Sequence, residues 1–159
     1  MQRGFGLGLG GSVYETLLLP IILVAIIASV GWWAYGDYRM KARVKAGLAL
    51  AAPAQAAVEK TFAAKGPLDF AATGTTGWVS PPPGADVQII TIARTGVITV
   101  RYTALLAAAG ENQIQIVPVS EGNALDLSNP ASAGRKFTWQ CGGAAGKTTL
   151  PAKIRGDCR

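Results

Sequence analysis

This chain has few side chains that could take part in catalysis. Their positions in the sequence do not match the spacing of any catalytic or phosphate-binding motif. No histidine is present to act as a general base. Residues 143–148, GAAGKT, lack the GxxxxGK[ST] spacing of a phosphate-binding loop. Six carboxylates lie in or beside expected loops without forming a pair in sequence: Asp69, Asp86, Glu111, Glu121, Asp126 and Asp157. We therefore expect no enzymatic activity and no cofactor.

Cys141 and Cys158 are the only cysteines, and both lie close to the C-terminus. They flank a loop rich in glycine, threonine and lysine, in a chain that also carries a membrane-length apolar run. This combination indicates a disulfide formed outside the cytoplasm, and closing such a loop is worth about 3 kcal/mol. Two reduced thiols are the alternative. A metal site is disfavoured, because two thiolates without histidine cannot complete a four-ligand zinc shell.

The elements that position these residues begin with a long apolar segment. Residues 16–36 contain no charged side chain, and a helix of about 21 residues spans about 30 Å, the hydrocarbon thickness of a bilayer. Ser12 and Glu15 have the spacing of a capping box, so we expect the helix to start there. Pro20 predicts a kink in its first turns. The glycine-rich residues 1–11 are expected to lie outside the helix, as a leader or an extension.

The helical pattern continues beyond residue 36 as an amphipathic segment. One apolar stripe recurs at three- and four-residue steps, formed by Val44, Leu48, Ala51, Val58 and Phe62. Pro53 predicts a second bend, and Gly66-Pro67 ends the pattern. We therefore expect residues 12–36 to form a hydrophobic transmembrane or filament-core helix. Residues 37–159 are expected to form a globular domain.

The rest of the chain predicts a small β-structure. Residues 68–85 are rich in glycine, threonine, serine and proline, which is typical of an irregular connecting loop. Strands are predicted at residues 87–93, 97–103, 113–119 and 136–141, with a short hairpin connection at residues 94–96 and a polar loop at 120–134. The fold class is therefore α+β: a long N-terminal helix on a four-stranded antiparallel sheet, with a C-terminal disulfide loop.

Charge and aromatic residues leave two questions open. The net charge of +6 suits an acidic partner such as nucleic acid, anionic lipid or another polyanion. Basic residues follow the apolar run, at Arg39, Lys41, Arg43 and Lys45, and by the positive-inside rule they would keep the C-terminal domain in the cytoplasm. The disulfide argues for export. An aromatic cluster ends the run, at Trp32, Trp33, Tyr35 and Tyr38, and predicts either an interfacial belt or stacking between subunits.

Several stretches of this sequence resemble those of type IV pilins. The segment LLLPIILVAIIASVGWWAYGDYRMKARV is similar to the hydrophobic helix of that family and to the junction that follows it. GVITVRY, FTWQC and LPAKIRGDC resemble the central hairpin, the strand entering the first cysteine and the closing cysteine motif of major pilins. The resemblance extends from Tyr14 to the C-terminus.

The resemblance implies processing by a prepilin peptidase, and the sequence leaves three arrangements open. Cleavage after Gly4 would make Phe5 the first residue, whereas cleavage after Gly10 would make Gly11 the first residue and Glu15 the fifth, where the family has a glutamate. Alternatively, Met1 is itself the mature end. Implied assembly residues are Glu15, Pro20, Trp32 and Trp33, with Glu15 pairing with a neighbour's N-terminus.

The implied function is structural. A subunit held in the inner membrane would be drawn by pilus assembly machinery into a homo-oligomeric helical filament on the cell surface, serving adhesion, surface motility or DNA uptake, with DNA or a host surface as further partners. A minor pilin or secretion pseudopilin is one alternative, and a membrane-anchored polyanion-binding module is another.

Overall fold

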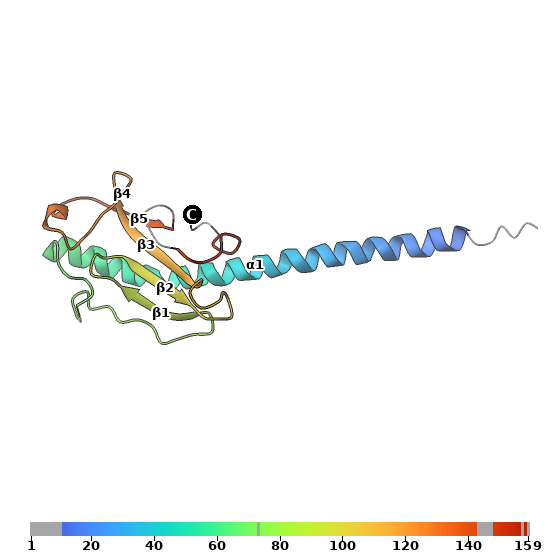
Figure 1. The fold of residues 1–159 in the computed structure, drawn as a ribbon, viewed down its shortest axis with the longest axis horizontal. Coiled ribbons are helices and arrows are strands. Elements are labelled where there is room, and N and C mark those ends of the chain that lie inside the picture. Colours follow the sequence, from blue (N-terminus) through green and yellow to red (C-terminus); the bar gives the residue numbers. More distant parts are fainter. Residues whose placement is uncertain (1–10, 73, 143–147, 157, 159) are drawn as a thin grey trace, which may run out of the picture. The chain divides into compact units, whose positions relative to one another are not determined.

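A computed structural model describes residues 11–72, 74–142, 148–156 and 158. By its internal contacts the chain divides into two compact units, Met1–Tyr38 and Arg39–Arg159. The described part of the first unit is helical throughout. The second unit contains the rest of that helix and the sheet (Figure 1).

A single helix, α1, extends over Gly11–Lys65. Its start lies one residue before the predicted Ser12, and the helix is continuous through Pro20 and Pro53. The side chains of the predicted capping box, Ser12 and Glu15, lie outside the described residues. The helix ends as predicted at Gly66, which has a φ of 73° and donates its N–H to the Phe62 carbonyl at 2.8 Å. Glycine adopts this left-handed conformation without steric cost.

The strands are antiparallel, as predicted, and four of them match the predicted segments closely. They are β1 (Val87–Ile92), β2 (Ile98–Tyr102), β3 (Gln113–Ser120) and β5 (Thr138–Cys141), with the additional β4 (Asn123–Ala124). The sheet order is β1-β2-β3-β4, and β5 also pairs with β3. A short 3-10 helix, η1 (Pro130–Ser132), lies between β4 and β5.

Strand β4 lies within residues 120–134, for which the sequence predicts a polar loop. Ser120 pairs with Asn123 across the two residues Glu121 and Gly122, whose φ angles are 52° and 81°. Two positive φ angles in a two-residue connection are the signature of a tight hairpin turn. The short strand that follows carries no apolar alternation, so only the turn residues could have indicated it.

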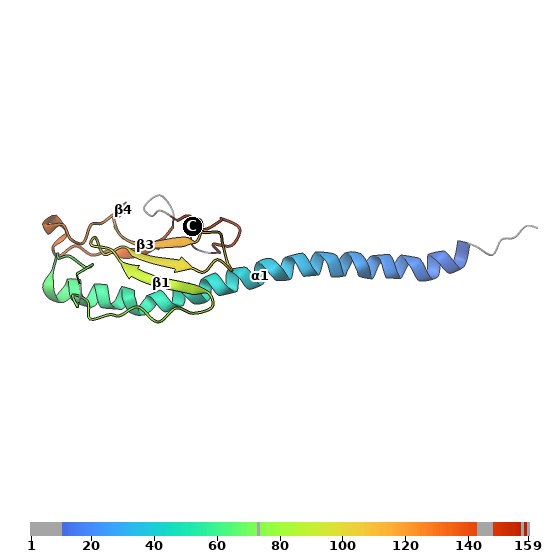
Figure 2. The same cartoon turned by 60° about the horizontal axis from the view of Figure 1, so that its bottom comes forward.

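The C-terminal half of α1 packs along one face of the sheet (Figures 1 and 2). The predicted apolar stripe forms this contact. Val44, Ala51 and Val58 are fully buried, Phe62 is 7% exposed, and Leu48 is partly buried. Removing these side chains from water stabilises the second unit, at about 25 cal/mol per Å² of apolar surface.

Helix and sheet approach each other most closely at Gly47. A Cβ atom there would lie 2.5 Å from Tyr102 Cε1 and 2.9 Å from Val87 Cγ2. The completely buried Tyr102 side chain donates its hydroxyl hydrogen to the Val44 carbonyl at 2.8 Å. Burial raises the pKa of Tyr102 well above the usual range of tyrosine, so this hydroxyl remains a donor. No local pattern in the sequence marks Gly47, because the residues it approaches lie far away in the chain, on β1 and β2.

A second apolar cluster connects the end of α1 to the connecting loop and β5. The rings of Phe62 and Phe137 meet edge to face with centroids 5.7 Å apart, and those of Phe137 and Trp139 do so at 5.5 Å. Phe70, from the connecting loop, is buried in the same cluster. Trp139 Nε1 donates a hydrogen bond to Glu59 Oε1 at 2.6 Å, which joins β5 to the helix.

The connecting loop also follows the outer edge of β1. Gly84 donates its N–H to the Val87 carbonyl at 2.8 Å, and Ser80 Oγ accepts from the Ile90 N–H at 3.3 Å. These bonds occupy backbone groups that an edge strand would otherwise leave unpaired.

The Cys141–Cys158 disulfide is present, as predicted, with Cα atoms 4.9 Å apart and a sequence separation of 17. Beyond β5, the chain remains bonded to β3: Gly142 donates to the Gln115 carbonyl at 3.1 Å, and Thr149 donates to the Gln113 carbonyl at 3.0 Å. Leu150 and Cys158 are buried in the main core. The disulfide loop is therefore an integral part of the second unit.

Candidate assembly surface

The apolar segment of α1 exposes its side chains on every side. From residue 20 to residue 30 all side chains are exposed, and the large ones retain between 54% and 64% of their accessible surface: Ile21, Ile22, Leu23, Val24, Ile26, Ile27 and Val30. Within the described residues, α1 is the one helix long and apolar enough to cross a membrane, judged by length and composition. A surface of this kind requires lipid or other protein around it.

The one polar side chain in this segment is satisfied locally. Ser29 donates its hydroxyl hydrogen to the Ile26 carbonyl at 2.8 Å, within the same helix. An unpaired hydroxyl in an apolar environment would cost free energy, and this bond removes most of that cost. The segment from residue 20 to residue 30 can therefore be surrounded by lipid or by other apolar helices.

The predicted assembly residues lie in or beside this segment. Pro20 is exposed within α1, and because it lacks an N–H the Thr16 carbonyl receives no helical hydrogen bond from it. Trp32 is 81% exposed. Glu15 and Trp33 are helical residues whose side chains lie outside the described part of the chain.

The predicted processing residues are only partly covered by the structure. Gly4, Phe5 and Gly10 lie outside the described residues, and Gly11 is the first residue of α1. A mature N-terminus at Gly11 would therefore place the new amine at the start of this helix.

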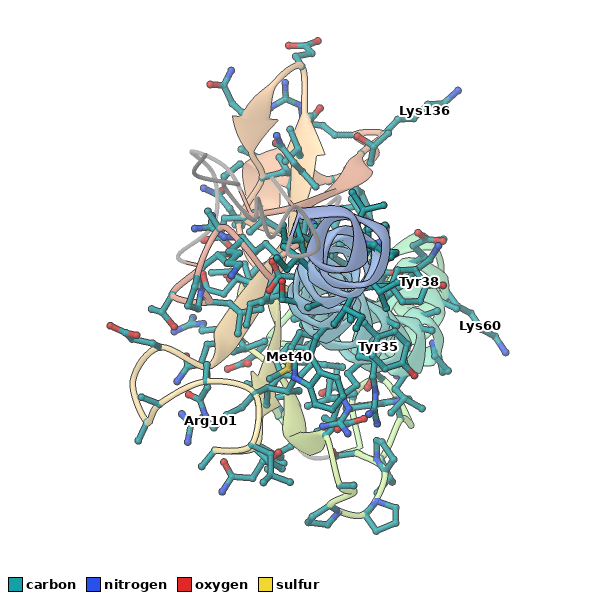
Figure 3. The ribbon with its side chains drawn as sticks, turned by 90° about the vertical axis from the view of Figure 1, so that its right-hand side faces the viewer. Tyr35, Tyr38, Met40, Lys60, Arg101 and Lys136 are labelled. Atoms are coloured by element: carbon teal, nitrogen blue, oxygen red, sulfur yellow. A yellow bond between two sulfur atoms is a disulfide. The ribbon has the colours of Figure 1, made fainter. Side chains whose placement is uncertain are left out.

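The aromatic residues that follow the apolar segment also project outward. Tyr35 and Tyr38 are 60% and 70% exposed, and Figure 3 shows both rings directed away from the helix axis. Exposed rings at the end of an apolar helix suit the membrane interface, where one part of the ring meets lipid and the hydroxyl meets water.

The C-terminal half of α1 has a face of small residues turned away from the sheet. Residues 46–58 carry no charge, and the exposed side chains among them are small apart from Leu50 and Pro53. They are Ala46, Ala49, Leu50, Ala52, Pro53 and Ala56. Another helix can approach such a surface closely, because neither bulk nor charge separates the two backbones.

Three described cations of the second unit point away from one another. Lys60, Arg101 and Lys136 are exposed and project in different directions in Figure 3. Ion pairs between described residues have N–O distances of 3.5 to 3.8 Å and partly or largely exposed side chains; they are Arg43–Asp86, Arg94–Asp69 and Arg135–Glu121. Exposed pairs of this kind contribute little to stability.

The described residues contain no group of three or more potential metal ligands. Two open grooves are present on the second unit. One is lined by Glu59, Phe62, Lys136 and Phe137, among others, and the second lies between the connecting loop and β1. Among the described residues that line them, neither groove brings together a nucleophile and a base.

Comparison with known proteins agrees with this geometry. The chain is 28% identical over 157 residues to the fimbrial protein EcpC of Eikenella corrodens, and the alignment covers 98% of this chain and 92% of that protein. The sequence profile of the Pilin family, described as a bacterial filament, matches residues 40–158. This match includes the amphipathic half of α1, the sheet and the disulfide loop. The chain therefore belongs to the pilin family of bacterial filament proteins.

Proposed function

We propose that this chain is a structural subunit of an extracellular type IV pilus. The observation that carries the proposal is the apolar segment of α1, which is exposed on every described side in a member of the pilin family. Such a segment has two environments open to it, the bilayer and a bundle of identical helices. A filament subunit occupies both in turn.

The driving force for assembly is the apolar surface of α1. In the inner membrane, lipid covers residues 20–30, and outside the membrane the same side chains must be kept from water by neighbouring subunits. At about 25 cal/mol per Å² of buried apolar surface, contacts along this segment strongly favour the polymer over an exposed monomer. The small-residue face of residues 46–58, on the part of α1 that belongs to the second unit, adds a further surface for helix packing.

The second unit supplies the exterior of the filament and performs no catalysis in this proposal. Its sheet, connecting loop and disulfide loop form a rigid surface that would be repeated along the cell-surface polymer. Prepilin peptidase and the pilus assembly machinery would act on the N-terminal part of the chain. Adhesion, surface motility and DNA uptake all depend on such a filament, and we assign the chain the structural role that they share.

Glu15 is proposed to set the register of neighbouring subunits. It is the carboxylate that borders the apolar run on its N-terminal side, and cleavage after Gly10 would make it the fifth residue of the mature chain. A charge left unpaired in an apolar core costs several kcal/mol, so pairing with a neighbour's N-terminal amine would favour one axial position.

A Glu15→Gln variant tests this role, because glutamine keeps most of the hydrogen-bonding capacity of a helix cap but removes the charge. Normal membrane levels with few filaments are expected. Glu111→Gln is the control, because it also removes one negative charge, at an exposed position outside α1. It should leave filaments intact. Wild-type filament yield from Glu15→Gln would reduce Glu15 to a helix cap, worth about 1 kcal/mol.

The proposal as a whole is tested by electron microscopy of filaments sheared from the surface of cells that express the chain. Mass spectrometry of the sheared subunit would identify its N-terminal residue. Filaments composed of this chain are expected. A chain that remains monomeric in detergent, keeps its N-terminus and forms no filaments would contradict the proposal and favour the membrane-anchored binding module.

A further inference from the structure

Two lysines on the first turns of the second unit form no ion pair with a described residue. Lys41 and Lys45 are exposed and lie four residues apart on α1, so their side chains share one face of the helix. The three ion pairs of the described chain involve other residues. Like charges at this spacing repel each other, which disfavours the helix unless an anion lies between or beside them.

Charged residues next to the two lysines on α1 have carboxylates or cations of their own nearby. Arg43 faces Asp86, with a 3.8 Å separation between Nη1 and Oδ1, so it is partly neutralised within the domain. Asp37 is a negative charge one turn before Lys41, and Lys45 has no carboxylate one turn away in either direction. The segment from residue 37 to residue 45 is therefore basic overall, with Arg39, Lys41 and Lys45 as its exposed cations, and the two lysines share one face of the helix.

These lysines follow the apolar and aromatic residues directly in sequence. Lys41 and Lys45 come three and seven residues after Tyr38 in the same helix. The Cα–Cβ bonds of a helix tilt toward its N-terminus, so both side chains lean in the direction of the apolar residues. A lysine can extend its apolar stem along the helix and place its ammonium among lipid headgroups.

We propose that Lys41 and Lys45 bind the phosphates of anionic phospholipids while the chain is held in the membrane. This inference rests on the membrane-held stage of the proposed function. It accounts for a basic segment on the exported side of an apolar helix, which the positive-inside rule disfavours. Anionic headgroups at that leaflet offset the unfavourable placement, and each lysine near such a surface raises the affinity about fivefold.

The test uses the full chain reconstituted in nanodiscs of phosphatidylcholine with and without phosphatidylglycerol, where one lipid at a time is brominated near the headgroup. Bromine quenches tryptophan fluorescence at short range, and Trp32 and Trp33 are the reporters beside the apolar segment. Wild-type chain should be quenched preferentially by brominated phosphatidylglycerol. The preference should fall sharply in 1 M salt, where the Debye length shrinks to about 3 Å.

The Lys41→Gln and Lys45→Gln double variant should lose this preference and keep its quenching by phosphatidylcholine. Lys60→Gln with Lys65→Gln is the matched control, since both are exposed lysines further along the same helix. The control should behave as wild type. Equal quenching of wild type by the two lipids, or a preference that survives the double substitution, would overturn the inference and leave the filament proposal standing.

Two further outcomes are distinguishable. Absence of quenching by either lipid would contradict the membrane-held stage and thus both proposals. Loss of filaments in the double variant with its lipid preference intact would show that the lysines pair with carboxylates of a neighbouring subunit, and it would also overturn the lipid assignment.

Discussion

Substitution of Gly47 by alanine tests the closest contact between α1 and the sheet. The added Cβ would lie 2.5 Å from Tyr102 Cε1, 2.9 Å from its Oη and 2.9 Å from Val87 Cγ2. Overpacking of a core costs about 1 to 3 kcal/mol, and displacing the Tyr102 hydroxyl from the Val44 carbonyl costs about 1 kcal/mol more. Alanine regains about 1 kcal/mol through its higher helix propensity. We expect a net destabilisation of about 1 to 3 kcal/mol.

The measurement is urea unfolding of the oxidised full chain in mild detergent, followed by near-UV circular dichroism. With an m-value of about 1 to 3 kcal/mol per M, the midpoint should fall by about 1 M. Gly36→Ala is the control, because no atom lies within 4 Å of a Cβ added there. In a Tyr102→Leu background, Gly47→Ala should cost much less. A Gly47→Ala chain as stable as wild type would refute the packing argument.

Two more predictions concern Tyr102 and the disulfide. Burial holds the pKa of Tyr102 in the folded protein above the usual value of 10.0. Below pH 10 the tyrosine is neutral in both the folded and the unfolded chain, and its contribution to stability is complete. As the pH rises further, the tyrosine ionises first in the unfolded chain, and the free energy of unfolding falls. Tyr102→Phe should lower stability by about 1 kcal/mol at neutral pH and remove this part of the alkaline decline, as measured by thermal unfolding at several pH values. Replacing Cys141 and Cys158 by serine should cost about 3 kcal/mol, measured by urea unfolding without reductant, and an unchanged midpoint would contradict the loop-entropy argument.

Most of the fold could be predicted because the patterns that encode it are local. The helix was located by an uninterrupted apolar run, an amphipathic stripe and a terminal glycine, and its observed start differs from the prediction by one residue. The four main strands follow from β-branched segments between turn residues. The contacts that set the distance between helix and sheet could not be predicted, because they join residues far apart in the chain, such as Gly47 with Tyr102 and Glu59 with Trp139.

Part of the assembly surface could also be predicted, because its patterns are local in the sequence. The membrane-length run and the aromatic cluster are visible in the sequence, and the structure adds that no described side chain of the run is covered. The sequence alone does not show which basic residues form ion pairs with carboxylates, because this depends on how distant segments pack together. Only the folded chain shows that Arg43 pairs with Asp86, whereas no ion pair of the described chain includes Lys41 or Lys45.

The loops that follow the strand edges would matter in the proposed filament, where copies of the second unit lie close together. An open β1 edge would there invite strand exchange between copies. Here Ser80 and Gly84 occupy groups on the β1 edge, while Gly142 and Thr149 continue the bonding of β3 beyond β5. In the proposed filament, contacts between copies would then be made by side chains and helices, while each sheet keeps its own strands.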